Sequence, residues 1–201
     1  MAEEPWRFDT GLTFSRFEQQ VKSEIGGAVG ELLVEETQFG LTAMGTYRVW
    51  GPISLGLFLQ YDVGNRSAGT FTGFDAEQRA VVATTTGGVY HEFWVGPLLR
   101  LDWRTLFLEL GYGAFGIRSD EARDDLPAAD GTTDSALLTH PGIAWLMAVG
   151  GGVPVTELLQ VVIRVEYRIR YYNRRVAGAL QNDINHGTQN ITPFIGVAWA
   201  F

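Results

Sequence analysis

Charged side chains alternate with apolar ones at Arg164, Glu166, Arg168 and Arg170. Successive residues of a strand point to opposite faces, so a strand here would carry all four charges on one face. If that face is enclosed, the charges must be paired, because an unpaired buried charge is strongly unfavourable. Arginine forms bidentate pairs with carboxylates, and such pairing would explain why Arg is used here rather than Lys.

The carboxylates that could pair with this row lie in other segments. Glu109 is expected at a depth similar to that of Arg164, and Glu166 stands between Arg164 and Arg168. Glu92 and Asp9 are further candidates. The predicted network therefore comprises Glu92, Glu109, Arg164, Glu166, Arg168 and Arg170, centred on Glu109 and Arg164. A gate or narrow pore is the functional interpretation, and a charged filling of an enclosed interior is the alternative.

The elements that would position these residues are strands, because apolar residues recur at every second position in eight segments. Each segment has about the length needed to cross a bilayer at a steep tilt. Pro97 and Pro193 lack a ladder hydrogen bond and predict bulges or register shifts. The predicted strands cover residues 6–15, 38–49, 53–62, 92–101, 106–113, 143–153, 159–171 and 191–201.

The predicted connections alternate between short and long. Tight turns are expected at 50–52, 102–104 and 154–157, and long polar loops at 22–36, 63–80, 118–140 and 173–188. Short turns on one side and long loops on the other are typical of outer-membrane barrels. Aromatic residues gather at the strand ends, as at the two interfaces of a membrane. The interface aromatics are Trp6, Trp50 and Trp103 on the short-turn side, and Trp145 and Tyr171 toward the loops.

The face opposite the apolar stripe distinguishes between kinds of β protein. It is rich in Gly and Ala, with a few Arg and Glu, as suits the crowded interior of a narrow barrel. A soluble β-sandwich would carry Lys, Glu, Ser and Thr there, and a ligand-carrying soluble barrel would be apolar inside and polar outside. No segment has the roughly 18 consecutive apolar residues of a membrane-spanning helix. The pattern favours an all-β, eight-stranded, antiparallel, up-and-down transmembrane β-barrel.

Composition narrows the function classes. The 201 residues suggest a single transmembrane β-barrel domain over 1–201, and the start Met1-Ala-Glu-Glu carries no signal peptide. The net charge of −8 argues against nucleic acid. Cysteine is absent, which fits an oxidising compartment, and Lys22 is the only lysine. Nothing in the apolar stripe demands a partner, so we expect a monomer.

Signals for catalysis or metal binding are weak. The acidic segment 118–140 lacks the EF-hand spacing, so we predict no metal site from it. The sequence leaves open whether this segment binds a cation. No cofactor fingerprint occurs. His91 is expected to face outward near the loop-side interface, without triad spacing around it, and His140 and His186 fall at loop ends. We therefore predict no catalytic residues and no enzyme activity.

The C-terminal segment carries the most specific pattern. Ile195, Val197, Trp199 and Phe201 are apolar and alternate with small residues, and the sequence stops on an aromatic. This ending resembles the signature by which assembly machinery recognises outer-membrane barrels. Over nearly its full length, the chain resembles the barrel domain of small OmpA/OmpX-type proteins.

That resemblance implies an integral protein of a Gram-negative outer membrane, with both termini periplasmic. Its implied partners are outer-membrane lipid and lipopolysaccharide, the barrel-assembly machinery and periplasmic chaperones, and an unknown extracellular ligand of the loops. The expected function is a membrane-anchored scaffold with a structural or adhesion role and a plugged lumen. A narrow gated, porin-like pore for ions or small solutes is the second possibility, and a lipid-modifying barrel enzyme is the third.

Overall fold

The structure is a computed structural model that describes residues 5–25, 28–84, 87–120, 136–176 and 179–201. The described residues form eleven strands, and none of them lies in a helix long and apolar enough to cross a membrane. The strands are β1 (Trp6–Ile25), β2 (Ala28–Trp50), β3 (Ile53–Arg66), β4 (Thr70–Phe74), β5 (Ala80–Thr84), β6 (Gly88–Trp103), β7 (Leu106–Tyr112), β8 (Phe115–Asp120), β9 (Ala136–Pro154), β10 (Leu159–Val176) and β11 (Ala179–Ala200).

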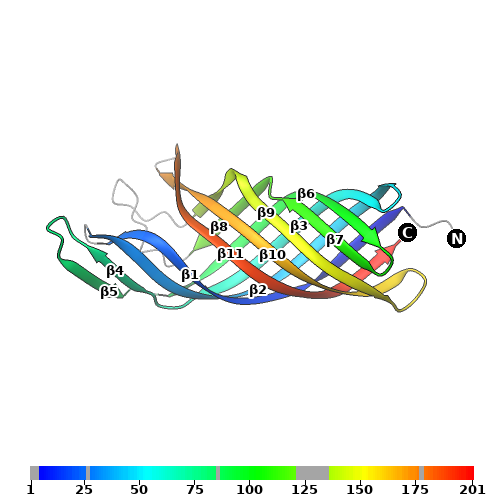
Figure 1. Cartoon of the computed structure of the whole chain (residues 1–201), viewed down its shortest axis with the longest axis horizontal. Helices are drawn as coiled ribbons and strands as arrows, with labels where there is room; N and C mark the ends of the chain where they lie inside the picture. Colours follow the sequence, from blue (N-terminus) through cyan, green and yellow to red (C-terminus); the bar gives the residue numbers. More distant parts are fainter. Residues whose placement is uncertain (1–4, 26–27, 85–86, 121–135, 177–178) are drawn as a thin grey trace.

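The strands close into an antiparallel ring with eight positions. Going round, the order is β1, β2, β3, β6, β7 with β8, β9, β10 and β11, and β11 pairs with β1 again. Arg7 is opposite Ala200, and the backbones of Trp6 and Phe201 exchange two hydrogen bonds of 3.0 and 3.1 Å. The prediction of an all-β antiparallel fold with eight strands in sequence order is thus confirmed for the ring. Figure 1 shows both termini at one end of it.

The connections are partly as expected. Tight turns follow β2, β6 and β9, as predicted. The long polar loops assigned to 22–36, 63–80 and 173–188 are wrong for much of their length, because β1, β2, β3, β10 and β11 continue through them. A hydrogen-bond ladder needs no apolar outer face, so these strands extend beyond the point where the apolar stripe ends. For the predicted loop 118–140, β8 reaches Asp120 and β9 starts at Ala136, and positions 121–135 lie outside the described residues.

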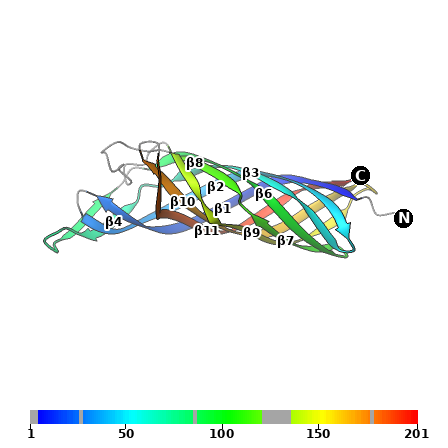
Figure 2. The same cartoon turned by 90° about the horizontal axis from the view of Figure 1, so that it is seen from above.

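A four-stranded sheet projects from the ring at the end away from the termini (Figures 1 and 2). It consists of the distal parts of β1 and β2, followed by β4 and β5. Val29 on β2 pairs with Phe74 on β4, which pairs in turn with Ala80 on β5. On its inner face Phe71 is fully buried, in a small cluster with Ala28 and Val34. We call this sheet the extension.

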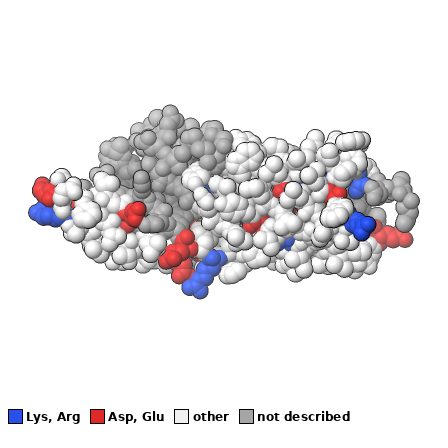
Figure 3. Space-filling view, in the orientation of Figure 1, with Lys and Arg blue, Asp and Glu red and all other residues white. Residues whose placement is uncertain are grey.

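The outer face of the ring is apolar on every strand. Leu12, Leu57 and Ile195 are each about 60% exposed, and their neighbours along each strand point inward. On the face shown in Figure 3, uncharged residues cover most of the ring. The inner face is close-packed and largely polar, with apolar side chains gathered in two small clusters around Trp94 and Phe107. The predicted assignment of faces is therefore confirmed.

The two prolines differ in their effect. Pro193 sits opposite Val165 with no break in register. Next to Pro97, β6 changes partner: Leu98 pairs with Gly111 at the end of the β7 ladder, and Val95 pairs with Phe115 at the start of the β8 ladder. Three residue steps on β6 therefore face four steps on the β7–β8 side, which has one extra residue. The predicted register shift therefore occurs beside Pro97, with the extra residue on the neighbouring strand, and no register shift occurs at Pro193.

Candidate functional site

The interior of the ring holds an ionic network. Among the described residues, six arginines and six carboxylates are buried, so their formal charges cancel. We call these twelve residues, which come from seven ring strands, the interior network. They are Arg66, Arg100, Arg118, Arg164, Arg168 and Arg170, with Asp9, Glu36, Asp62, Glu92, Glu109 and Glu166.

At the short-turn end, the network is centred on Arg100. Its Nη1 donates to Asp9 Oδ2 at 3.0 Å and to Glu109 Oε1 at 2.8 Å. Its Nε donates to the half-buried Asp102 at 2.9 Å. Arg7, also half-buried, donates to Asp9 at 2.8 Å and to Gln160 at 3.0 Å. Strands β1, β6, β7 and β10 are therefore tied together by charge-assisted hydrogen bonds, which are the stronger kind.

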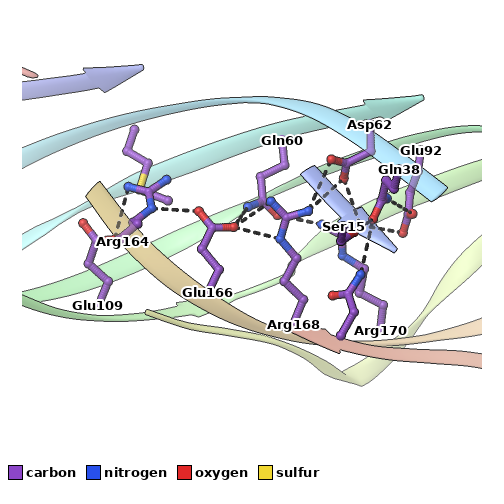
Figure 4. Close-up of polar contacts among 12 residues, drawn as sticks. Ser15, Gln38, Gln60, Asp62, Glu92, Glu109, Arg164, Glu166, Arg168 and Arg170 are labelled. Atoms are coloured by element: carbon purple, nitrogen blue, oxygen red, sulfur yellow. Dashed lines mark hydrogen bonds and ion pairs between the residues drawn. The ribbon is translucent and has the colours of Figure 1, made fainter. Parts of the chain in front are cut away.

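The middle of the network follows β10 (Figure 4). Arg164 Nη1 lies 3.3 Å from Glu109 Oε2, and Arg164 Nε donates to Glu166 Oε1 at 2.7 Å. Arg168 contacts the other oxygen of Glu166, with Nη2 at 2.6 Å and Nε at 2.8 Å. Gln60 Nε2 donates to that oxygen as well, at 3.1 Å. The structure thus brings together Glu109, Arg164, Glu166 and Arg168, with Glu166 between two arginines.

Toward the extension, Arg170 joins two carboxylates. Its Nη1 lies 3.0 Å from Asp62 Oδ2 and 2.9 Å from Glu92 Oε1. Asp62 also accepts from Arg168, at 3.3 Å. Glu92 accepts from Trp94 Nε1 at 2.6 Å and from Gln38 Nε2 at 3.1 Å. Each carboxylate therefore has several donors, as a charge enclosed away from water requires.

A further ion pair of the interior network lies beyond this point. Arg118 on β8 donates to both oxygens of Glu36 on β2, at 2.7 and 3.1 Å, and both side chains are fully buried. The guanidinium stacks on the Tyr90 ring, 3.7 Å from its centroid. Arg100 and Arg164 stack in the same way on Phe107 and Phe194. A planar guanidinium can both stack and bond bidentately, which a lysine cannot do.

Small residues provide the space for these long side chains. Arg164 is flanked in register by Gly150 on β9, and Glu166 by Ala148. Gly40 faces Asp62 across the β2–β3 ladder, where an added Cβ would overlap Asp62 Oδ1 and Thr13 Oγ1. The Gly- and Ala-rich inner face of the sequence therefore determines where the charges fit.

The sequence-predicted network residues are all in the interior, and Asp9 joins them as anticipated. Five members of the interior network are absent from the predicted set: Glu36, Asp62, Arg66, Arg100 and Arg118. Asp62 and Arg100 stand on the inner face of predicted strands, so strand parity could have found them. Glu36, Arg66 and Arg118 fall in the predicted loops, because the apolar stripe ends before them, whereas the structure has them in β2, β3 and β8.

The predicted surface residues lie as follows. Trp6, Trp50 and Trp103 are exposed at the short-turn end, and Trp145 packs against Tyr112 with ring centroids 5.3 Å apart. Tyr171 is half-buried and accepts from Gln189 at 2.8 Å. The residues of the predicted assembly signal lie together on the outer face at β11, where Ile195, Trp199 and Phe201 are exposed and Val197 is half-buried.

A cavity of about 870 Å³ opens at the short-turn end. Its lining includes the turn residues Gly51, Pro52 and Arg104, and the network residue Arg100. We call it the vestibule. Farther in, beside Trp94 and Arg170, a void of about 10 Å³ has room for no more than one water.

Metal or catalytic groupings are not seen in the part of the chain that the structure describes. No three His, Asp or Glu side chains there are arranged to hold a metal. His91 is half-buried, and its Nδ1 lies 2.8 Å from the outward-facing Tyr61 hydroxyl. The side chains of His140 and His186, and most of the acidic segment 118–140, lie outside the described residues.

Comparison with known proteins adds no family assignment. No protein-family model matches the sequence, and a search of curated proteins finds no match.

Proposed function

We propose that the chain is an integral β-barrel protein of a bacterial outer membrane, in which the ring spans the lipid. One observation carries this proposal: every strand of the ring exposes apolar side chains outward, and the ring encloses the twelve charged residues of the interior network. This is the reverse of a water-soluble β protein and suits a ring surrounded by hydrocarbon. Closure of the ring supports the same proposal, because a closed sheet leaves no backbone edge in lipid.

The height of the apolar surface supports a membrane location. On β3 the outward residues from Ile53 to Val63 are all apolar apart from Tyr61. Ten residue steps along a strand tilted by roughly 40–45° rise about 25 Å, the height of the apolar band of such barrels. Asn65 ends this stripe on β3, and the exposed ion pair of Arg16 with Glu35 ends it on β1 and β2.

We further propose that the ring is an anchor and that the extension faces the outside of the cell, where it takes part in surface interactions. The interior network acts as a plug in this proposal. Its charges cancel, its carboxylates are multiply bonded, and stacked aromatic rings fill the space beside its guanidinium groups. The membrane, the assembly machinery with its chaperones, and an extracellular ligand remain proposed partners.

A narrow pore is the second candidate, and the vestibule is the observation that favours it. This cavity reaches the network from the short-turn end, so a rearrangement of a few arginines would lengthen the open path. The tight ion pairs at Arg100 and Arg164 oppose the pore and favour the plug.

Single cysteines test the membrane proposal, because the chain has none of its own. Leu57→Cys lies on the apolar stripe, and Glu77→Cys lies on the exposed tip of the extension. In protein folded into lipid vesicles, we expect a water-soluble maleimide to label Glu77→Cys but not Leu57→Cys until detergent and denaturant are added. Equal labelling of both variants in intact vesicles would contradict a membrane-spanning ring.

A further inference from the structure

The extension ends in an open strand edge. β5 is hydrogen-bonded to β4 on one side, and among the described residues no strand pairs with its other side. Natural edge strands are usually protected by Lys, Pro, a bulge or an inward-pointing charge. The five residues of β5, Ala-Val-Val-Ala-Thr, carry none of these, and Val82 at their centre is 69% exposed. The free edge is therefore a template for another strand.

The charge around β5 is low for a chain with a net charge of −8. In the adjoining turn, Arg79 is 2.7 Å from Asp75 and 2.9 Å from Glu77, so one of the two acidic charges there is balanced. Asp75 Oδ1 also accepts from the backbone N–H of Glu77 and of Arg79, which holds the turn in one shape. Because β5 itself carries no charged residue, the strand adds no charge repulsion between two copies paired along it.

We propose that β5 pairs antiparallel with β5 of a second copy, centred on Val82, and that this pairing joins copies in two facing membranes. In that register Ala80 is opposite Thr84 of the second copy, and Val82 is opposite Val82. Small and β-branched residues then meet, and no like charges oppose each other. This inference rests on the proposed membrane location.

The orientation of the two copies follows from symmetry. Two antiparallel strands of one sheet are related by a two-fold axis perpendicular to that sheet. The extension continues the wall of the ring (Figures 1 and 2), so this axis points radially, across the long axis of the ring. A half-turn about it reverses the long axis, and the second ring must point the opposite way. Two copies in the same membrane point the same way and cannot pair in this manner.

The contact is short, and five residue pairs give weak binding for a single pair of molecules. Many copies on two apposed membranes act together, and avidity increases the overall strength by orders of magnitude. Vesicles that carry many copies are therefore the right probe.

Cysteine cross-linking between two vesicle populations tests the register. The protein in one vesicle population carries an added tag, so a disulfide-linked dimer formed between the two populations has its own mobility on a gel. We expect a mixed disulfide for Val82→Cys with itself and for Ala80→Cys with Thr84→Cys. Ala80→Cys should not cross-link with itself, because two such residues would lie on the order of 13 Å apart, beyond disulfide reach. Cross-linking only within one population, or equally for all pairs, would overturn the proposal.

Vesicle clustering gives the second measurement. Val82→Lys places a charge on the edge and should abolish clustering. Val29→Lys is the matched control, because Val29 is 66% exposed on the same sheet but lies on β2, between β1 and β4. It should cluster like the wild type. Absence of wild-type clustering, or equal clustering by Val82→Lys, overturns the pairing.

The labelling of Leu57→Cys in the same vesicles separates this inference from the proposed function. If Leu57→Cys is protected and no clustering occurs, the pairing alone is wrong. If Leu57→Cys is labelled freely, the membrane location fails, and the facing-membrane contact fails with it.

Discussion

Replacing Arg164 with alanine probes the centre of the interior network. Arg164 bridges Glu109 on β7 and Glu166 on its own strand, at 3.3 and 2.7 Å. The change leaves the interior with one excess negative charge. Neither carboxylate is left alone, because Glu109 keeps Arg100 at 2.8 Å and Glu166 keeps Arg168 at 2.6 Å.

The magnitude follows from these remaining partners. Removing one partner of a buried pair typically costs about 3–5 kcal/mol, because a charge is left uncompensated. Both carboxylates here retain a guanidinium, so we expect Arg164→Ala to lower the free energy of unfolding by roughly 2–3 kcal/mol. Glu166→Gln in the same molecule restores the balance of charge. The double variant should therefore be more stable than the sum of the two single effects predicts, by at least about 1 kcal/mol.

Urea unfolding in lipid vesicles, followed by tryptophan fluorescence, measures all four members of this cycle. Strict additivity would refute the argument that charge balance governs the network. If Arg164→Ala alone lowers the free energy of unfolding by the full amount of about 3–5 kcal/mol expected for an unpaired buried charge, Arg100 and Arg168 do not compensate for the loss.

Conductance gives an independent test of the plug on the same proteins. In planar bilayers we expect the wild type to be silent and Arg164→Ala to pass current. Arg79→Ala, on the exposed extension, is the control and should stay silent. Uniform current steps from the wild type would contradict the plug and favour the pore.

Three further outcomes are expected. Arg118→Ala should lower the free energy of unfolding by about 3–5 kcal/mol, because Glu36 loses its bidentate partner; Arg79→Ala, which removes an exposed pair, should cost at most about 1 kcal/mol by urea titration. Gly40→Ala should cost about 1–3 kcal/mol through overlap with Asp62, whereas Gly45→Ala, with nothing within 4 Å, should cost far less in the same assay. Arg16 holds the pKa of Glu35 below its usual value through a hydrogen bond. The stability that this pair contributes is therefore fully present above the ordinary pKa of Glu and is lost as the pH falls through the lowered pKa. NMR titration should show that Arg16→Ala raises the pKa of Glu35. An unchanged pKa would exclude the hydrogen bond.

The ring could be predicted because one physical signal, strand parity, repeats in every segment. On β10 the alternation of Ile163 and Val165 with Arg164 and Glu166 gives both the element and its two faces. Counting residues from the tight turns gives the depth of each residue in the ring and predicts Glu109 and Arg164 at a similar depth. In the structure these two side chains are 3.3 Å apart. These predictions depend on local periodicity and short connections, which a sequence displays directly.

The extension could not be predicted on the same basis. Its strands have no long apolar stripe. In addition, β4 pairs with residues 29–33 of β2, although β3 lies between β2 and β4 in the sequence, so the rule that consecutive strands pair does not predict this contact. Asp62 and Arg100 were visible on the inner face, but their partners depend on the stagger around the ring. Arg170 reaches Asp62 from a strand on another part of the ring, and only the closed geometry brings them together.

Closure between β1 and β11 has a consequence for how the molecule folds. The strands that seal the ring are the two that lie farthest apart in the sequence, and Trp6 bonds to Phe201. Such a contact closes the largest loop the chain can make, which is entropically unfavourable and slow to form. Until it forms, two long unpaired edges stay open to other chains. Folding in isolation is therefore expected to compete with aggregation, with the seal between β1 and β11 as the late step that decides between them.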